Sequence, residues 1–214
     1  MTDLKELYDA VLNGDQTVAT AVTREALARG EEPLTLVHRF LIPAMDEVGR
    51  RFECEEYFVP DLLLAARAMK SSLELLRPLL AAAGADPLGR VVIGTVKGDL
   101  HDIGKNLVAS MLEGGGFEVC DLGTDVAPER FVEAARAQHA DVVCLSALLT
   151  VTMPAMRTTV AAFREAGIRD AVKILVGGAP ITPQFAREIG ADAYGENAVS
   201  ALALARNLLL AARP

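Results

Sequence analysis

The feature that most constrains the fold is a change of hydrophobic period near residue 84. Before it, apolar residues recur at the three- and four-residue spacing of amphipathic helices. After it, short runs rich in Val, Ile and Leu alternate with helical stretches. The turn-forming segment GADPLG (84–89) separates the two patterns and is typical of a linker. These patterns predict a helical domain over residues 1–85 and an α/β domain over residues 86–214.

Four helices are predicted in the first domain. Asp15 follows an Asn-Gly turn and lies where its side chain can cap the second helix. The third helix is expected to begin near Pro33 and to end at Gly49. Pro60 fits the first turn of the fourth, which carries a long apolar stripe. Because the connections are short, a small four-helix bundle is expected.

The second domain is predicted to be a flavodoxin-like (Rossmann-like) domain with a five-stranded parallel sheet. The strands are expected at 91–96, 117–122, 141–148, 172–178 and 191–195. Strands that alternate with helices imply right-handed βαβ crossovers, here in the order 2-1-3-4-5. In such sheets ligands bind beyond the carboxyl ends of the strands, near the point where the strand order reverses. We therefore expect the chemistry in the loops after strands one, three, four and five.

Charge and cysteine content limit which kinds of binding partner and which cellular compartment are expected. Acids outnumber bases 29 to 21, and the net charge of -8 disfavours nucleic acid and anionic membranes, which are polyanions. Charged residues interrupt each apolar run before it reaches the length of about 20 residues that a spanning helix needs. Cys54, Cys120 and Cys144 are few and far apart, which suits a reducing cytoplasm. A cytoplasmic protein without nucleic-acid or membrane partners is expected.

The loop after the first predicted strand, GTVKGDLHDIGKN (94–106), is dense in acids and glycines and contains a histidine. It does not match a P-loop, because five residues separate Gly98 from Gly104 and Asn106 stands where Ser or Thr is required. The glycine spacing also fails the GxGxxG pattern of dinucleotide-binding folds. A phosphate-binding loop is therefore not supported.

Asp99 and His101 are two residues apart, so in an extended loop both side chains point the same way. This arrangement suits a metal-ligating histidine whose other ring nitrogen donates to a carboxylate. Asp102 lies where it can cap the next helix, and Gly104 allows a bulky ligand to approach closely. Taken alone, an Asp-His pair of this spacing is more often part of a helix cap than of a ligand site.

The segment DLHDIG (99–104) resembles the DxHxxG signature of cobalamin-binding domains. The resemblance continues in the expected order through SALLTVT (146–152), VGGAP (176–180) and AYGENA (193–198). Upstream, residues 48–70 are similar to the helical cap that precedes this domain in methionine synthase and in methyltransferase corrinoid proteins. The likeness covers essentially the whole chain. Its length is closest to the small corrinoid proteins of methylamine, methanol and aryl-ether methyl transfer.

The resemblance implies that His101 is the lower axial ligand of a cobalamin cobalt, in place of the cofactor's own dimethylbenzimidazole. Asp99 would accept a hydrogen bond from the other ring nitrogen. Thr152 would continue this relay with its hydroxyl group. By the same resemblance, the rest of the loop against the corrin is formed by Gly98, Leu100, Asp102 and Gly104.

The displaced nucleotide tail of the cofactor is expected in a slot beside the sheet. By resemblance, Ser146 and Thr150 would bond it, Gly177 and Gly178 would leave it space, and Ala198 would close the last loop. Taken alone, Ser146 is equally well a strand-end cap and the two glycines an ordinary turn. Their joint occurrence in the family's order favours the cofactor site.

In the helical domain, Phe58 matches the aromatic residue that family members place over the upper, methyl-bearing face of the corrin. Met69 and Ala65 are weaker candidates for the same face. The alternative is that all three residues belong to the apolar core.

The resemblance implies a methyl-carrier subunit of one-carbon metabolism rather than a self-sufficient catalyst. Its expected partners are a substrate-specific methyltransferase, an acceptor methyltransferase that uses tetrahydrofolate or a thiol such as coenzyme M, and a reductive activase. The segment 84–89 is the expected hinge between the two domains.

Two other functional classes of protein are the alternatives. A corrinoid-dependent sensor would use the same domain with a DNA-binding module, but the acidic first segment has no basic recognition helix. A signalling receiver would need acids at the end of strand one and a lysine after strand five. The acids are absent from GTVKG (94–98), and Gly195 and Glu196 stand where the lysine is required, so this class is disfavoured further.

Overall fold

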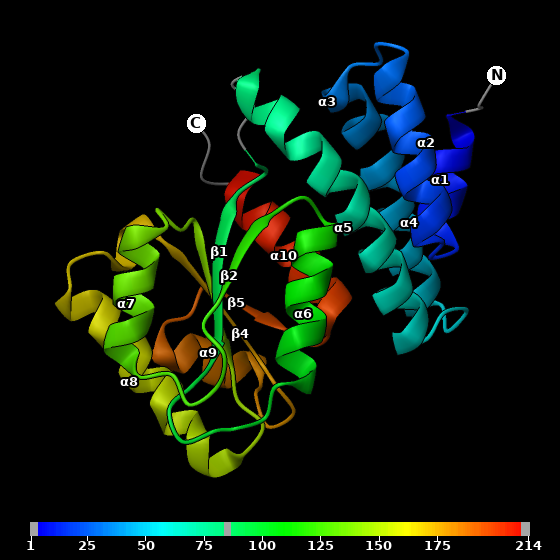
Figure 1. The fold of residues 1–214 in the computed structure, drawn as a ribbon. Helices are drawn as coiled ribbons and strands as arrows, with labels where there is room; N and C mark the ends of the chain where they lie inside the picture. Colours follow the sequence, from blue (N-terminus) through cyan, green and yellow to red (C-terminus); the bar gives the residue numbers. More distant parts are fainter. Residues whose placement is uncertain (1–3, 84–86, 211–214) are drawn as a thin grey trace. The chain divides into compact units, whose positions relative to one another are not determined.

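The structure is a computed structural model that describes residues 4–83 and 87–210. The chain divides into two compact units (Figure 1). One comprises Met1–Pro87 with Glu113–Gly116, and the other comprises Leu88–Leu112 with Phe117–Pro214. Half of the expected hinge is not covered, because residues 84–86 of the segment 84–89 lie outside the described residues. No helix within the described ranges is both long enough and apolar enough to cross a bilayer.

The first unit is helical. Its elements are α1 (Lys5–Leu12), α2 (Gln16–Ala28), α3 (Pro33–Leu36), the π-helical turn η1 (Val37–Leu41), α4 (Ile42–Glu53) and α5 (Val59–Ala82). The predicted cap of α2 is confirmed, since Asp15 Oδ1 accepts from the Val18 N–H at 2.9 Å. Apolar side chains of α1, α2, α4 and α5 are buried, among them Leu7, Val22 and Met45.

The predicted end of the third helix at Gly49 is wrong. The segments α3, η1 and α4 follow one another without a break and end at Glu53. Pro43 in the first turn of α4 lacks an N–H, and its ring crowds the preceding turn. The wider π turn directly before it accommodates this ring. Gly49 is buried inside the helix. The helix continues past it because Glu47 pairs with Arg50 and Arg51 of the next turn.

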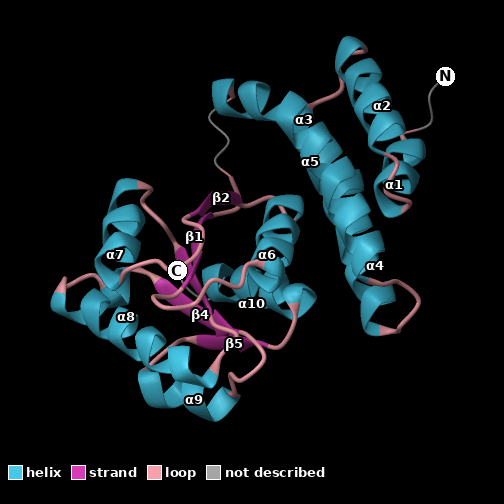
Figure 2. Ribbon diagram, turned by 60° about the horizontal axis from the view of Figure 1, so that its bottom comes forward, coloured by secondary structure: helices cyan, strands magenta, loops and turns pink. Residues whose placement is uncertain are grey.

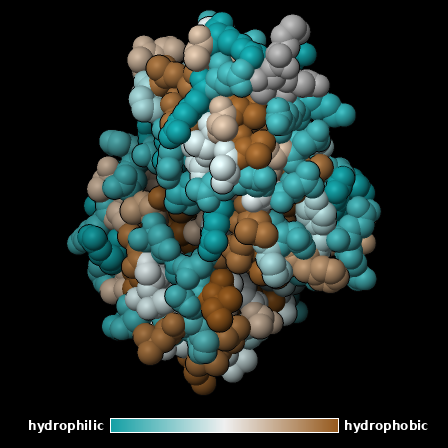
Figure 3. All heavy atoms as spheres, turned by 45° about the vertical axis from the view of Figure 1, so that its right-hand side comes forward, coloured by the Kyte–Doolittle hydropathy of each residue, from teal (hydrophilic) through white to brown (hydrophobic). Residues whose placement is uncertain are grey.

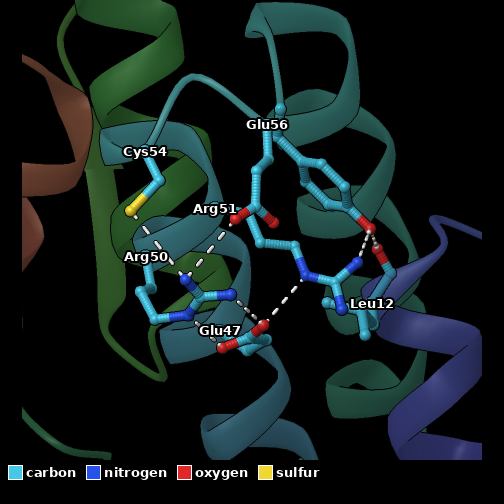
Figure 4. A network of polar contacts seen from close by, with 7 residues as sticks. Leu12, Glu47, Arg50, Arg51, Cys54 and Glu56 are labelled. Carbon is cyan, nitrogen blue, oxygen red and sulfur yellow. Dashed lines mark hydrogen bonds and ion pairs between the residues drawn. The ribbon is translucent and has the colours of Figure 1, made fainter.

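A polar network holds the turn between α4 and α5 (Figure 4). Glu47 lies between two guanidinium groups and accepts from Arg50 Nε and Nη2 at 2.7 Å each and from Arg51 Nε at 2.9 Å. Arg51 also donates to the Tyr57 hydroxyl, which in turn donates to the Leu12 carbonyl at 3.2 Å. The remaining partners, both beside Arg50, are the exposed Cys54 thiol and the Glu56 carboxylate. The network ties this turn to the end of α1.

The second unit is the predicted α/β domain. Its strands are β1 (Arg90–Thr95), β2 (Glu118–Asp121), β3 (Val142–Ser146), β4 (Lys173–Gly177) and β5 (Ala193–Gly195). Its helices are α6 (Ile103–Gly114), α7 (Pro128–Ala137), η2 (Thr150–Thr152), α8 (Met153–Glu165), η3 (Arg169–Ala171), α9 (Pro183–Ile189) and α10 (Ala198–Leu210). The strands are parallel in the order β2-β1-β3-β4-β5, which confirms the predicted topology and fold class.

Helices cover both faces of this sheet. Figures 1 and 2 show α7, α8 and α9 on one face and α6 and α10 on the other. The three inner strands, β1, β3 and β4, are buried runs of β-branched and other apolar residues, as expected of a parallel sheet covered on both sides. Phe131 of α7 and Phe163 of α8 are fully buried against the first face.

The carboxyl ends of four strands are level. In the sheet register Thr95 lies opposite Ser146, Ser146 opposite Gly177, and Gly177 opposite Gly195. We call these four residues the strand-end row. The strand order reverses between β1 and β3, so the predicted ligand loops leave the sheet from this row.

Candidate functional site

The loop from β1 to α6 holds His101 in a defined orientation. The buried Thr95 hydroxyl donates to the His101 carbonyl at 2.8 Å, which fixes the loop backbone. His101 Nδ1 lies 2.7 Å from Asp99 Oδ1, and the His101 main-chain N–H donates to the same oxygen at 3.1 Å. Since a carboxylate only accepts, Nδ1 carries the proton and Nε2 a lone pair. The side chain is 49% exposed, and within the described chain Nε2 has no hydrogen-bond partner.

The Asp99 carboxylate is completely buried. Its second oxygen, Oδ2, accepts from Thr152 Oγ1 at 2.7 Å and from the Leu148 N–H at 2.8 Å. Burial by itself raises the pKa of Asp99, but the hydrogen bonds from Thr152, Leu148 and His101 outweigh it and hold the pKa well below its ordinary value. Asp99 is therefore ionised at neutral pH.

The three residues predicted to form a relay are in contact. Thr152, Asp99 and His101 make a continuous chain of hydrogen bonds from the loop after β3 to the loop after β1. The chain crosses the sheet where the strand order reverses, and its exposed end is Nε2 of His101. The arrangement presents one imidazole nitrogen of fixed tautomer to a ligand.

Other predicted residues lie in the same loop as His101. Gly98 has a φ of +85°, a backbone conformation that favours glycine. Gly104 lies in the first turn of α6, and a Cβ added there would meet no atom within 4 Å, so the space beside it is open. Leu100 is exposed. Asp102 directly precedes α6, and its carboxylate accepts from the side-chain amide of Asn106 at 3.1 Å.

The predicted glycines bring two loops close together. At Gly178, with a φ of +131°, a Cβ would lie only 1.9 Å from the Ala147 carbonyl oxygen. At Gly177 it would lie 2.9 Å from a carbonyl oxygen of β5. Ser146 ends β3 in the strand-end row, and Ala198 is buried at the start of α10. The loops after β3, β4 and β5 therefore adjoin, as predicted.

Large apolar side chains are exposed beside His101. This apolar rim consists of Leu100, Ile103, Leu148, Leu149 and Val151, which are between 41% and 85% exposed. Thr150, the last of the predicted residues in these loops, is exposed among them. Figure 3 shows apolar surface at the lower end of the view, where the loops that follow the strands lie. An apolar rim around an exposed imidazole nitrogen suits a large, flat and mainly apolar ligand.

In the helical unit, Phe58 is 65% exposed, so it is not a core residue. It precedes α5, and its N–H donates to Asp61 Oδ2 at 2.8 Å. The weaker candidates Met69 and Ala65 are fully buried, as the alternative of core residues requires.

Two residues of this site were not predicted. Thr95 ends a strand, where a β-branched residue is unremarkable, and nothing in the sequence indicates its bond to His101. Asp125 lies after β2, in a loop outside the four that were expected to carry chemistry. It nevertheless bonds the main chain of Gly98 and Asp99.

Comparisons with known proteins agree with this geometry. A family model described as a B12 binding domain matches residues 89–203, and a second model of the same description matches residues 3–77. The chain is 43% identical over 208 residues to the dimethylamine corrinoid protein of Methanosarcina barkeri, covering 96% of this chain and 97% of the relative. It is 44% identical over 204 residues to trimethylamine corrinoid protein 1 of Methanosarcina acetivorans, covering 94% of each.

Solved structures are similar over the same length. A cobalamin-binding protein from Desulfitobacterium hafniense matches with a TM-score of 0.80 and 31% identity, covering 97% of this chain and 99% of that one. The methanol:cobalamin methyltransferase complex of Methanosarcina barkeri matches with a TM-score of 0.86 and 28% identity, covering 97% of this chain and 80% of that one. The chain belongs to the B12 binding domain family and, within it, to the corrinoid proteins of methyltransferase systems. Its cofactor is a cobalamin.

The residues present fit this cofactor. An imidazole nitrogen is a suitable ligand for cobalt, and His101 would offer one through Nε2. The apolar rim and the open space beside Gly104 suit the corrin ring, which is broad and mainly apolar.

Proposed function

We propose that the chain carries a methyl group between two methyltransferases. The first takes the methyl group from a substrate, and the second passes it to tetrahydrofolate or to a thiol such as coenzyme M. The observation that carries the proposal is the buried, ionised Asp99, which fixes His101 with its Nε2 lone pair directed away from the protein carboxylate. When bound, cobalamin supplies the methyl-transfer chemistry through its cobalt, and the chain supplies ligation and orientation.

His101 would act as the lower axial ligand through Nε2. The hydrogen bond from Nδ1 to the ionised Asp99 makes the imidazole a better donor to a metal. Thr152 keeps Asp99 in place and holds its own hydroxyl proton against Oδ2.

The other predicted residues would hold the rest of the cofactor. Those proposed to lie against the corrin are Gly98, Leu100, Asp102 and Gly104, and those proposed to hold the nucleotide tail are Ser146, Thr150, Gly177, Gly178 and Ala198. Open space at Gly104 supports its assignment, whereas Gly177 and Gly178 let the loops after β3, β4 and β5 approach one another. Phe58, exposed in the α4–α5 turn, is proposed for the upper face of the corrin.

Likeness to a methanol:cobalamin methyltransferase complex and to methylamine corrinoid proteins supports a substrate-specific methyltransferase as the first partner. An acceptor methyltransferase and a reductive activase complete the proposed set. We place the activity in the cytoplasm, where the free thiols of Cys54, Cys120 and Cys144 stay reduced.

The test is cobalt binding by the purified protein. Wild type and His101→Ala are incubated with hydroxocobalamin and desalted, cobalt per chain is measured, and the samples are reduced to Co(II) for electron paramagnetic resonance. His38→Ala, which removes an exposed histidine of the helical unit, is the matched control.

We expect near-stoichiometric cobalt with a nitrogen hyperfine coupling in wild type and in His38→Ala. The coupling should be lost in His101→Ala. Folded wild-type protein that retains no cobalt would refute the proposal. So would an unchanged nitrogen coupling in His101→Ala.

A further inference from the structure

The loop between β2 and α7 lies along the loop that carries His101. Val126 in this loop pairs with Val96 as an isolated parallel bridge just beyond the end of β1. The preceding residue, Asp125, has a φ of +54°. This left-handed conformation is uncommon for a residue with a side chain, and Asp is among the few that adopt it readily. The conformation brings both the main chain and the carboxylate of Asp125 to the β1–α6 loop.

Asp125 makes three contacts with consecutive residues of that loop. Its Oδ1 accepts from the Gly98 N–H at 2.8 Å, and its Oδ2 accepts from Lys97 Nζ at 3.2 Å. Its own N–H donates to the Asp99 carbonyl at 2.9 Å. The Gly98 N–H first, and Lys97 after it, lower the pKa of Asp125, so the carboxylate is ionised at neutral pH. Asp125 therefore holds the main chain on both sides of the peptide bond that joins Gly98 to Asp99, at the Gly98 N–H and at the Asp99 carbonyl.

These contacts complete the support of Asp99. Its carboxylate is held by Thr152 and the Leu148 N–H from the loop after β3. Its main chain is held by Asp125 from the loop after β2. The Asp125 carboxylate holds the neighbouring Gly98 N–H. Without this carboxylate the flexible backbone at Gly98 can rotate and move the carboxylate that orients His101, although the main-chain bond from Asp125 to Asp99 remains.

We propose that Asp125 is a positioning residue for the axial ligand. Resting on the proposed function, the inference is that Asp125 acts through Gly98 and Asp99 to keep His101 Nε2 where it can bind cobalt. Asp125 does not touch the cofactor in this role. Its loss therefore lowers the share of protein with a coordinated imidazole without altering the apolar rim.

Four variants test this role. Asp125→Ala removes the carboxylate, and Asp125→Gly does so without strain at a positive φ, which keeps the test valid if the Ala variant fails to fold. Asp125→Asn keeps an oxygen that can accept from Gly98. Asp141→Ala is the matched control, because Asp141 Oδ2 accepts from the Arg90 N–H at 2.7 Å at the opposite end of β1.

Two measurements are made on each variant. The first is amide hydrogen exchange at Gly98 in the protein without cofactor, which reports the hydrogen bond from the Gly98 N–H to Asp125. The second is the dissociation constant for hydroxocobalamin together with the nitrogen hyperfine coupling of the Co(II) form. The Ala and Gly variants should exchange Gly98 faster, lose most of the nitrogen coupling and bind about tenfold more weakly, as loss of a charge-assisted hydrogen bond implies.

Asp125→Asn and Asp141→Ala should keep the coupling. The inference is overturned if Asp125→Ala and Asp125→Gly retain wild-type coupling and affinity, or if Asp141→Ala shows the same loss. Failure of the proposed function has a different signature, because wild type itself would then lack the nitrogen coupling while the Gly98 exchange still differed among the variants.

Discussion

At the scale of single residues, Asp99 concentrates the interactions of the site. It is a buried charge that receives hydrogen bonds from two side chains and from main-chain N–H groups of two loops. A buried charge is tolerated only when its hydrogen-bonding capacity is met. Here the Thr152 hydroxyl, the His101 ring and main-chain N–H groups meet that capacity, so the ionised form persists.

Thr152 is the residue at which this support can be weakened most selectively. Thr152→Val keeps the shape but removes the donor to Asp99 Oδ2, so the free energy of unfolding should fall by about 1–3 kcal/mol at pH 7. Urea denaturation of the protein without cofactor measures the change. Thr152→Ser keeps the hydroxyl and should lose clearly less. Equal losses in the two variants would mean that the methyl group supports the site as much as the donor does.

Much of the site could be predicted at this scale, because His101, Asp99 and Thr152 are chemically distinctive and lie in a recognisable order. Asp125 and Thr95 could not be predicted. They act on main-chain atoms, and the position of a neighbouring loop's main chain is fixed only by the folded sheet. The same holds for the N–H groups of Leu148 and Leu149.

At the scale of elements, strands were easier to predict than helix ends. Runs of β-branched residues between turns mark a buried parallel strand with little ambiguity. A glycine, in contrast, ends a helix only if nothing holds the next turn. Beyond Gly49 the pairs of Glu47 with Arg50 and Arg51 hold it, and the helix continues to Glu53.

Glu47 should make the helical unit sensitive to acid. Hydrogen bonds from Arg50 and then Arg51 lower the pKa of Glu47 from 4.5 to about 2. A lowered pKa in the folded state means that ionised Glu47 adds stability above pH 4.5, and that this stability is lost as the pH falls towards 2.

Glu47→Gln should therefore be less stable than wild type at pH 7, and the difference should shrink at pH 4 and below. Urea denaturation at several pH values measures it, with Glu56→Gln as control because Glu56 lies 3.7 Å from Arg50 and is half exposed. A stability difference that stays constant with pH would exclude an electrostatic origin.

At the scale of the whole molecule, the chain combines a helical unit with a sheet unit that carries His101, the proposed axial ligand. A ligand that binds only the folded protein stabilises it by mass action. Hydroxocobalamin at a hundredfold excess over its dissociation constant should therefore raise the free energy of unfolding by about 2.7 kcal/mol. Calorimetry of the full chain measures the shift of the melting temperature. His101→Ala at the same cofactor concentration should shift less, and an equal shift would show that the histidine contributes nothing to affinity.

The strand-end row has two chemically different halves. Its members on β1 and β3, Thr95 and Ser146, carry hydroxyl groups, whereas its members on β4 and β5, Gly177 and Gly195, present bare peptide groups. The Thr95 hydroxyl is already used to hold the His101 carbonyl, and the two glycines let neighbouring segments pack closely against the backbone. One half of the row therefore fixes a loop by a side chain, and the other half does so by having none.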